Sequence, residues 1–224
     1  MQKKPLKKEA HKRGAPCDSN KEATEKKRLL EEQSRFLMTK QHHKKTYEEA
    51  KQMGRMDEDF IPLCDFVAKT KNYFTSSSCA GRIALIGLGE DETKQESAFY
   101  RKWHRTVKEK EVLEAVKDFT GKILWFKQEA IILHIGANNL ENAKNLLILC
   151  EKVGIKRAGI KVAKDGKFIV EILGTQNINA PIKEEDMCVS EDYLKYLVKK
   201  GNEKFKKNQE LITKLTEQAK KDLK

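Results

Sequence analysis

The densest group of chemically capable side chains in this sequence lies in the run FTSSSCAGRIAL, residues 74–85. Successive small hydroxyl residues ahead of a glycine let backbone N–H and side-chain O–H groups converge on one anion. Arg82 adds a planar cation suited to phosphate or carboxylate. The same composition is typical of a polar turn whose arginine points to water, so both interpretations stay open. Cys79 has no neighbouring histidine or second cysteine, which favours an inert thiol over a nucleophile.

Two further groups combine an indole with an imidazole. Trp103 directly precedes His104, and Trp125 and Glu129 precede His134 on neighbouring segments. Indoles stack on nucleobases or lie over cations, and an imidazole accepts a proton near neutral pH. The alternative interpretation is structural, with a core tryptophan beside a surface histidine in the first group and a satisfied strand histidine in the second.

Several common catalytic signatures are absent from the sequence. Gly87-Leu88-Gly89 follows a predicted strand but lacks the third glycine of a dinucleotide fingerprint, so we interpret it as a loop. No Walker A, GxSxG, HExxH or zinc-deaminase pattern occurs. The five cysteines show no CxxC spacing, which indicates reduced thiols and no structural zinc. We therefore predict a protein without a metal.

The positive charge lies at the two ends of the chain. Of the net charge of +12, residues 1–55 contribute +8 and residues 199–224 contribute +5, so the middle is close to neutral. Basic ends favour a polyanionic partner, because neutralised phosphates release counterions; solubility is the other explanation. The basic N-terminus precedes no apolar run, and no eighteen-residue apolar stretch exists. We expect a cytoplasmic protein without a membrane span.

The hydrophobic periodicity predicts an α+β fold with a mixed, largely antiparallel sheet packed with helices. We predict a disordered basic tail over residues 1–18 and a single domain over residues 19–224. Helices are expected from Asp18 or Ser19 toward Met53, over 58–71 with Asp57 as N-cap, over 108–118, from Asn138 or Asn139 through Val153, and from Ser190 toward Lys220. Strands are expected over 73–75, 82–88, 99–104, 123–126, 130–135, 158–163, 167–173 and 175–182, with loops over 76–81 and 87–97 and a hairpin at Asp165-Gly166.

Taken in order, these motifs resemble the tRNA wybutosine-synthesizing protein three family, in its archaeal form. The resemblance covers roughly residues 28–215 and rests on FTSSSCAGRIAL (74–85), KWHRTVKEKEVLEAV (102–116), WFKQEAIILHIGANNLENAKNLL (125–147), GIKRAGIK (154–161) and GNEKFKKNQELI (201–212). No single piece is specific, but the combination is. Ala80, Ala130 and Gly201 stand where the family often has Ser, Pro and Ala, and none of these departures removes a candidate functional group.

The resemblance implies a methyltransferase that uses S-adenosylmethionine and lacks the Rossmann fold. Family members methylate the N(4) position of the tricyclic wyosine precursor made from guanosine 37 of phenylalanine tRNA, so this tRNA is the expected partner. We expect one of two imidazoles, those of His104 and His134, to accept the proton of the target nitrogen. The expected cofactor-binding residues are Ser77, Ser78, Arg82, Trp103, Trp125 and Glu129, and further matched site positions are Asp57, Cys79, Gly81, Arg157 and Asn202.

Two other functions remain compatible with these residues. A non-catalytic module that binds structured RNA would explain the charge and the aromatic–basic pairs, and it would give no heat with S-adenosylmethionine in calorimetry. An enzyme acting on a small anionic metabolite would explain the hydroxyl-rich run, and its binding would survive removal of both basic ends. The methyltransferase hypothesis adds one structural expectation, that this run, both tryptophans and both imidazoles share a single cavity.

Overall fold

The structure is a computed structural model that describes residues 18–89 and 98–223, and only the backbone of residues 18–20. The predicted tail over 1–18, apart from Asp18, and most of the predicted loop over 87–97 lie outside the described residues. The elements are α1 (Asp18–Gln52), the short 3-10 helix η1 (Glu58–Phe60), α2 (Ile61–Lys69), β1 (Tyr73–Cys79), β2 (Arg82–Leu88), β3 (Ala98–Trp103), α3 (Glu109–Lys117), β4 (Ile123–Glu129), β5 (Ile132–Ala137), α4 (Leu140–Lys152), β6 (Arg157–Lys164), β7 (Lys167–Leu173), β8 (Ile178–Glu184), β9 (Asp186–Met187) and α5 (Glu191–Asp222).

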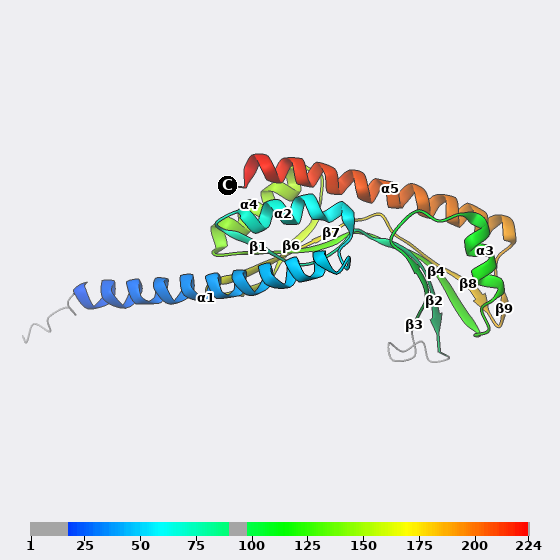
Figure 1. Cartoon of the computed structure of the whole chain (residues 1–224), viewed down its shortest axis with the longest axis horizontal. Helices are drawn as coiled ribbons and strands as arrows, with labels where there is room; N and C mark the ends of the chain where they lie inside the picture. The colour runs from blue at the N-terminus through cyan, green and yellow to red at the C-terminus, as the bar shows by residue number, and fades with distance from the viewer. Residues whose placement is uncertain (1–17, 90–97, 224) are drawn as a thin grey trace, which may run out of the picture.

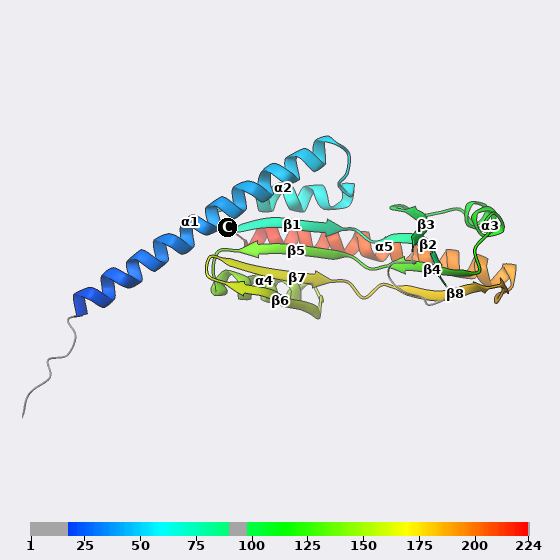
Figure 2. The same ribbon diagram turned by 90° about the horizontal axis from the view of Figure 1, so that it is seen from below.

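The strands form two antiparallel sheets that lie side by side along the length of the molecule (Figures 1 and 2). One has four strands in the order β1-β5-β7-β6, and the other has five in the order β3-β2-β4-β8-β9. Only Ala80 and Gly81 separate β1 from β2, and only Ala130 and Ile131 separate β4 from β5. Both strand pairs therefore pass from one sheet into the other. The predicted α+β class with antiparallel pairing and no Rossmann topology is confirmed.

One face of both sheets is covered by helices, with α5 running along the two sheets in succession (Figure 1). The apolar positions of α5 recur every three or four residues, which gives the helix one continuous buried stripe. Its first half packs with α3 on the five-stranded sheet, and its second half packs with α2 and α4 on the four-stranded sheet. This single long helix thus fixes the position of the junction between the sheets.

Helix α1 crosses the opposite face of the four-stranded sheet, and its N-terminal part extends beyond the sheet (Figures 1 and 2). Phe36 is buried against Phe74 and Ile169, and the Lys40 ammonium donates to the carbonyls of Thr70 and Tyr73. Few other α1 side chains are buried, as its sparse apolar positions indicated. The helix is therefore anchored by its second half.

The prediction of a loop over residues 76–81 is wrong for most of its length. Ser76 to Cys79 continue β1, which pairs with β5 along its whole length and shifts register once, between Thr75 and Ser77. Serine has a low strand propensity, but pairing with a central strand outweighs it. The serine side chains consequently alternate between the two faces of the sheet, so they do not gather around one anion.

Candidate active site

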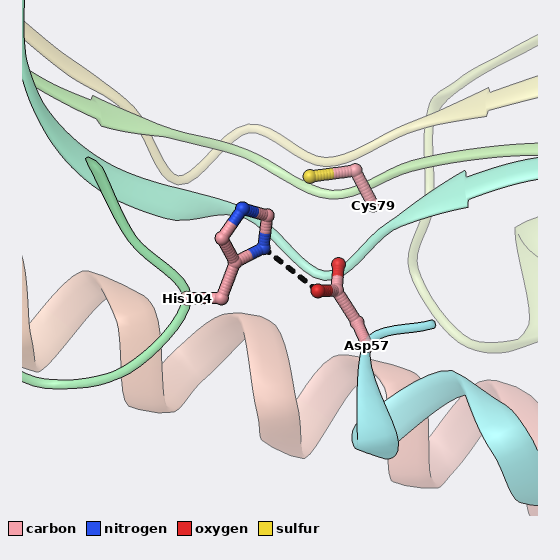
Figure 3. A group of neighbouring side chains, drawn as sticks. All are labelled: Asp57, Cys79 and His104. Atoms are coloured by element: carbon pink, nitrogen blue, oxygen red, sulfur yellow. Dashed lines mark ion pairs between the residues drawn. The ribbon is translucent and has the colours of Figure 1, made fainter. Parts of the chain in front are cut away.

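Asp57 and His104 form the central polar contact at the junction between the sheets (Figure 3). Asp57 precedes η1 as predicted, but its carboxylate makes no cap hydrogen bond to that helix. Its Oδ2 accepts from the backbone N–H of Ala80 at 2.6 Å, and its Oδ1 lies 2.7 Å from His104 Nδ1. The neutral imidazole then carries its proton on Nδ1, so Nε2 keeps a free lone pair. With its side chain 39% exposed, His104 can accept a proton from a ligand.

A cavity of about 670 Å³ lies beside this pair. Its walls come from the segment after α1, the segment between β3 and α3, and α5; they are Gly54, Arg55, Met56, Asp57, Glu58, Asp59, His104, Arg105, Thr106, Phe205 and Gln209. The volume is typical of sites for nucleoside-sized ligands. His104 and Asp57 both line it, so a molecule bound in the cavity would lie against this pair.

The Cys79 thiol is the third group at the junction, and its sulfur lies within 4.8 Å of the ligand atoms of Asp57 and His104. A histidine, a cysteine and an aspartate can together hold zinc. However, two ligand atoms of a tetrahedral zinc site with bonds of about 2.0 Å are separated by about 3.3 Å. The 2.7 Å between His104 and Asp57 is instead a hydrogen-bond distance. Burial raises the pKa of the Cys79 thiol, which favours the inert-thiol interpretation. The absence of a metal remains a prediction.

A second polar cluster lies on the α1-facing side of the four-stranded sheet. Ser77 Oγ lies 2.9 Å from His134 Nδ1, and His134 Nε2 lies 3.1 Å from Glu171. The ammonium of Lys161 donates to the other oxygen of Glu171 at 3.0 Å. Ser77, His134 and Glu171 stand opposite one another on the adjacent strands β1, β5 and β7, which explains their contacts. Both ring nitrogens of His134 are engaged, so His134 is less suited than His104 to accept a proton directly from a ligand.

The charge of Glu171 is stabilised by this cluster, because hydrogen bonds from Lys161 first and His134 second lower its carboxyl pKa from the ordinary value. A lowered folded-state pKa stabilises the folded protein at pH values above the unfolded-state pKa, and this stabilisation disappears as the pH falls through the folded-state pKa.

We expect Glu171→Gln to lower the free energy of unfolding at pH 7 by up to about 1 kcal/mol, since the Glu171–Lys161 pair lies near the surface. At pH 3 the difference should shrink. Urea unfolding at both pH values, with the exposed Glu210→Gln as control, measures this; an equal difference at both would contradict it.

Arg82 and Glu129 form an ion pair across β2 and β4, where these strands leave the junction. The Arg82 guanidinium also lies 4.4 Å from the centroid of the Phe99 ring. Its charge is thus already matched within the protein. Binding of an anion by Arg82 stays a prediction, and it would require the anion to share the guanidinium with Glu129.

The two tryptophans lie on opposite faces of the five-stranded sheet. Trp103 packs against the core between this sheet and its helices, and it stands opposite the buried Ile83. Trp125 lies between Leu124 and Phe126, which face that core, so its own side chain points to the other face. With His104 at the cavity and His134 under the other sheet, the expectation of one shared cavity is wrong. The sheet alternation places Trp103 on the helix-covered face, whereas Trp125, Ser77 and His134 point to the other face.

The chain matches the family model described as methyltransferase TYW3 over residues 25–221. It belongs to this family. A tRNA(Phe) 7-((3-amino-3-carboxypropyl)-4-demethylwyosine(37)-N(4))-methyltransferase of Thermococcus sibiricus is 34% identical over 187 residues, 83% of this chain and 95% of that protein. A methyltransferase of the same name, numbered 1, from Pyrococcus horikoshii is 36% identical over 181 residues, 80% of this chain and 92% of that protein. The solved structure of the PH1069 protein from Pyrococcus horikoshii superposes with a TM-score of 0.78 at 35% identity, covering 85% of this chain and 97% of that one.

The remaining motif positions of this methyltransferase TYW3 chain lie at different distances from the cavity. Asn202, on α5, accepts from the Val107 N–H at 2.9 Å and donates to the Val107 carbonyl at 2.8 Å, which fastens the segment after His104 to the helix. Ser78 contacts the buried Cys64 thiol on the helix-covered face. Arg157 is exposed on β6, the edge strand of the four-stranded sheet. It is in register with Cys79 but lies three strands away, so their backbones are about 14 Å apart. The structure brings neither Ser78 nor Arg157 to the cavity.

Several polar residues at the two sites were not predicted from the sequence. Arg55, Asp59 and Gln209 line the cavity, and Glu171 completes the cluster on the other face. Gln209 and Glu171 carry no local signal, since their roles depend on which segments pack together. The run Asp57-Glu58-Asp59 at a helix start was a usable signal, because capping needs one acidic residue and not three in succession.

Proposed function

We propose that this chain transfers a methyl group from S-adenosylmethionine to the N(4) position of a 4-demethylwyosine-type base at position 37 of phenylalanine tRNA. Membership of the methyltransferase TYW3 family supports the reaction class, and the names of the two relatives supply the base and the tRNA. The observation that carries the proposal in the structure is the His104–Asp57 pair at the wall of a nucleoside-sized cavity.

The residues around the cavity fit a proton acceptor next to a methyl-transfer centre. When bound, S-adenosylmethionine supplies an electrophilic methyl group on its sulfonium. Since the target nitrogen loses a proton on methylation, the free Nε2 of His104 accepts it. Asp57 then stabilises the imidazolium through the hydrogen bond to Nδ1, and the Ala80 N–H holds the other carboxylate oxygen in place. The rest of the rate enhancement comes from alignment of the two reactants.

The basic helices supply the contact to the tRNA backbone in this proposal. The exposed lysines of α5 include Lys199, Lys206 and Lys207, and Lys199 and Lys206 line a shallow hollow together with Lys108. Lysine contacts to phosphates position a nucleic acid without reading its sequence. Among the described residues, no helix has the length and hydrophobicity needed to cross a membrane. We propose a cytoplasmic location, where the tRNA substrate is found.

Methyl transfer to tRNA from a strain that lacks this gene tests the proposal. Incubation with the protein and S-adenosylmethionine should add one methyl group to the modified nucleoside of phenylalanine tRNA, as measured by mass spectrometry of the digest. Calorimetry with S-adenosylmethionine alone should show binding. An unmethylated nucleoside, together with no heat from the methyl donor, would instead favour the non-catalytic RNA-binding module.

A further inference from the structure

Some of the charged residues that line the cavity have partners within the protein, and others do not. They are Arg55, Asp57, Glu58, Asp59 and Arg105. Both oxygens of Asp57 accept hydrogen bonds, from Ala80 and His104. The Arg105 guanidinium is held by both carboxylate oxygens of Glu111, at 2.6 and 3.1 Å. Asp57 and Arg105 are therefore already committed to partners in the protein.

Arg55 and Asp59 carry charges that the protein leaves unbalanced. The Asp59 carboxylate accepts from Gln209 Nε2 at 3.2 and 3.1 Å, and this amide is neutral. Asp59 is half-buried, and Gln209 fixes the orientation of its carboxylate. Arg55 forms no ion pair with any residue in the ranges 18–89 and 98–223. Arg55 and the oriented Asp59 thus stand in the same cavity without charged partners among these residues. The exposed Glu58 is a further anion at the cavity that forms no ion pair with them.

Ligand chemistry follows from this pair of opposite charges. A simple anion would be attracted by Arg55 but repelled by Asp59. A simple cation would be attracted by Asp59 but repelled by Arg55. A group that carries a carboxylate and an ammonium on one carbon satisfies both. Guanidinium binds carboxylate through two parallel hydrogen bonds, and a carboxylate accepts readily from an ammonium.

We infer that the cavity beside His104 binds an α-amino acid group, with Arg55 pairing with its carboxylate and Asp59 with its ammonium. The inference deepens the proposed function and rests on it for the identity of the ligand. Two reactants of that reaction end in the same group. One is S-adenosylmethionine, through its methionine part, and the other is the 3-amino-3-carboxypropyl chain that the names of the relatives give for their substrate.

Two charge-removing variants, Arg55→Met and Asp59→Asn, test the inference. Arg35→Met on the exposed part of α1 and Asp165→Asn in the turn between β6 and β7 make the same changes of charge away from the cavity. Asn-Gly suits that turn as well as Asp-Gly does. All four variants should keep the wild-type thermal midpoint within a few degrees, since the substituted groups lie at the surface or cavity wall.

Two binding measurements separate the two sources of the amino acid group. The first is calorimetry with S-adenosylhomocysteine and with 5′-methylthioadenosine, which lacks the amino acid group. The second is the Kd of phenylalanine tRNA with and without the aminocarboxypropyl chain. If the methyl donor occupies the cavity, Arg55→Met and Asp59→Asn weaken S-adenosylhomocysteine binding about 10- to 100-fold and leave methylthioadenosine unchanged. If the tRNA chain occupies it, the same variants leave both nucleosides unchanged and remove a similar preference for the tRNA that carries the chain.

The inference is overturned if both cavity variants behave like their surface controls in both measurements. It is also overturned if the wild-type protein binds each ligand no better with the amino acid group than without it. Both measurements detect binding alone. A wild-type protein that shows the expected preference but methylates no tRNA would refute the proposed reaction while supporting the amino acid site.

Discussion

Replacing His104 with glutamine should lower kcat for methyl transfer about 10²- to 10⁴-fold, the range typical for loss of a general base. Glutamine can still hydrogen-bond to Asp57, but its amide cannot accept the proton that the target nitrogen releases. Because His104 is exposed at the cavity wall, the substitution should leave folding intact. Single-turnover methylation of phenylalanine tRNA measures the effect, and circular dichroism verifies the fold.

The comparison with other histidines makes this result specific. His42→Gln, on the exposed side of α1, should retain full activity. His134→Gln should cost less than His104→Gln, because both ring nitrogens of His134 already contact Ser77 and Glu171. A large loss of activity in His134→Gln, with near-normal turnover in His104→Gln, would contradict this assignment. It would indicate that the proton acceptor lies in the second cluster and that Ser77 contacts the substrate.

The starts of α4 and α5 were predictable because each of these helices carries a local capping signal. Asn139 caps α4 by accepting from Asn142 N–H at 2.8 Å, and Ser190 caps α5 by accepting from Tyr193 N–H at 3.2 Å, as the sequence indicated. The hairpin at Asp165-Gly166 joins β6 and β7, with Gly166 at a φ of 73°. Caps and tight turns depend on a few adjacent residues, so they can be recognised without the tertiary structure.

Strand ends were less predictable, because pairing extends strands through unfavourable residues. A strand was expected over 175–182, but β8 runs from Ile178 to Glu184 and passes through Pro181. The strand tolerates this proline because the register with β4 shifts between Leu124 and Trp125, where Pro181 lies. Proline is accommodated at such irregularities, because the hydrogen-bond ladder is already interrupted there and the missing N–H of proline leaves no further acceptor unpaired.

The division of the site residues into two clusters could not be read from the sequence. Period-two alternation predicts which residues of one strand share a face, but not which face of which sheet meets a helix. Trp103 and Trp125 were both recognised as aromatic motif residues, yet they point in opposite directions from one sheet. The pairing of Asp57 with His104 likewise depends on the junction, where two distant segments are held against α5.

Replacing Gly81 with alanine should destabilise the protein by about 3 kcal/mol or more. Gly81 joins β1 to β2 with a φ of 90°, a conformation that side chains other than glycine rarely adopt. A Cβ atom would lie 2.5 Å from the backbone oxygen of Glu129 and 2.5 Å from Asn208 Nδ2. Those two atoms form the hydrogen bond that ties the buried Asn208 of α5 to β4. Urea unfolding measures the loss.

Gly159→Ala on β6 is the matched control, because a Cβ atom there would meet nothing within 4 Å and the backbone has no positive φ. Its stability should stay within about 1 kcal/mol of wild type. Equal stabilities of the two variants would show that the junction is not tightly packed around Gly81.

The neighbouring Ala80 N–H donates to Asp57, so backbone strain at Gly81 should also displace the carboxylate that orients His104. Gly81→Ala should therefore lose methyl transfer even under conditions in which it remains folded, whereas Gly159→Ala should not, and this difference links the bend between the sheets to catalysis.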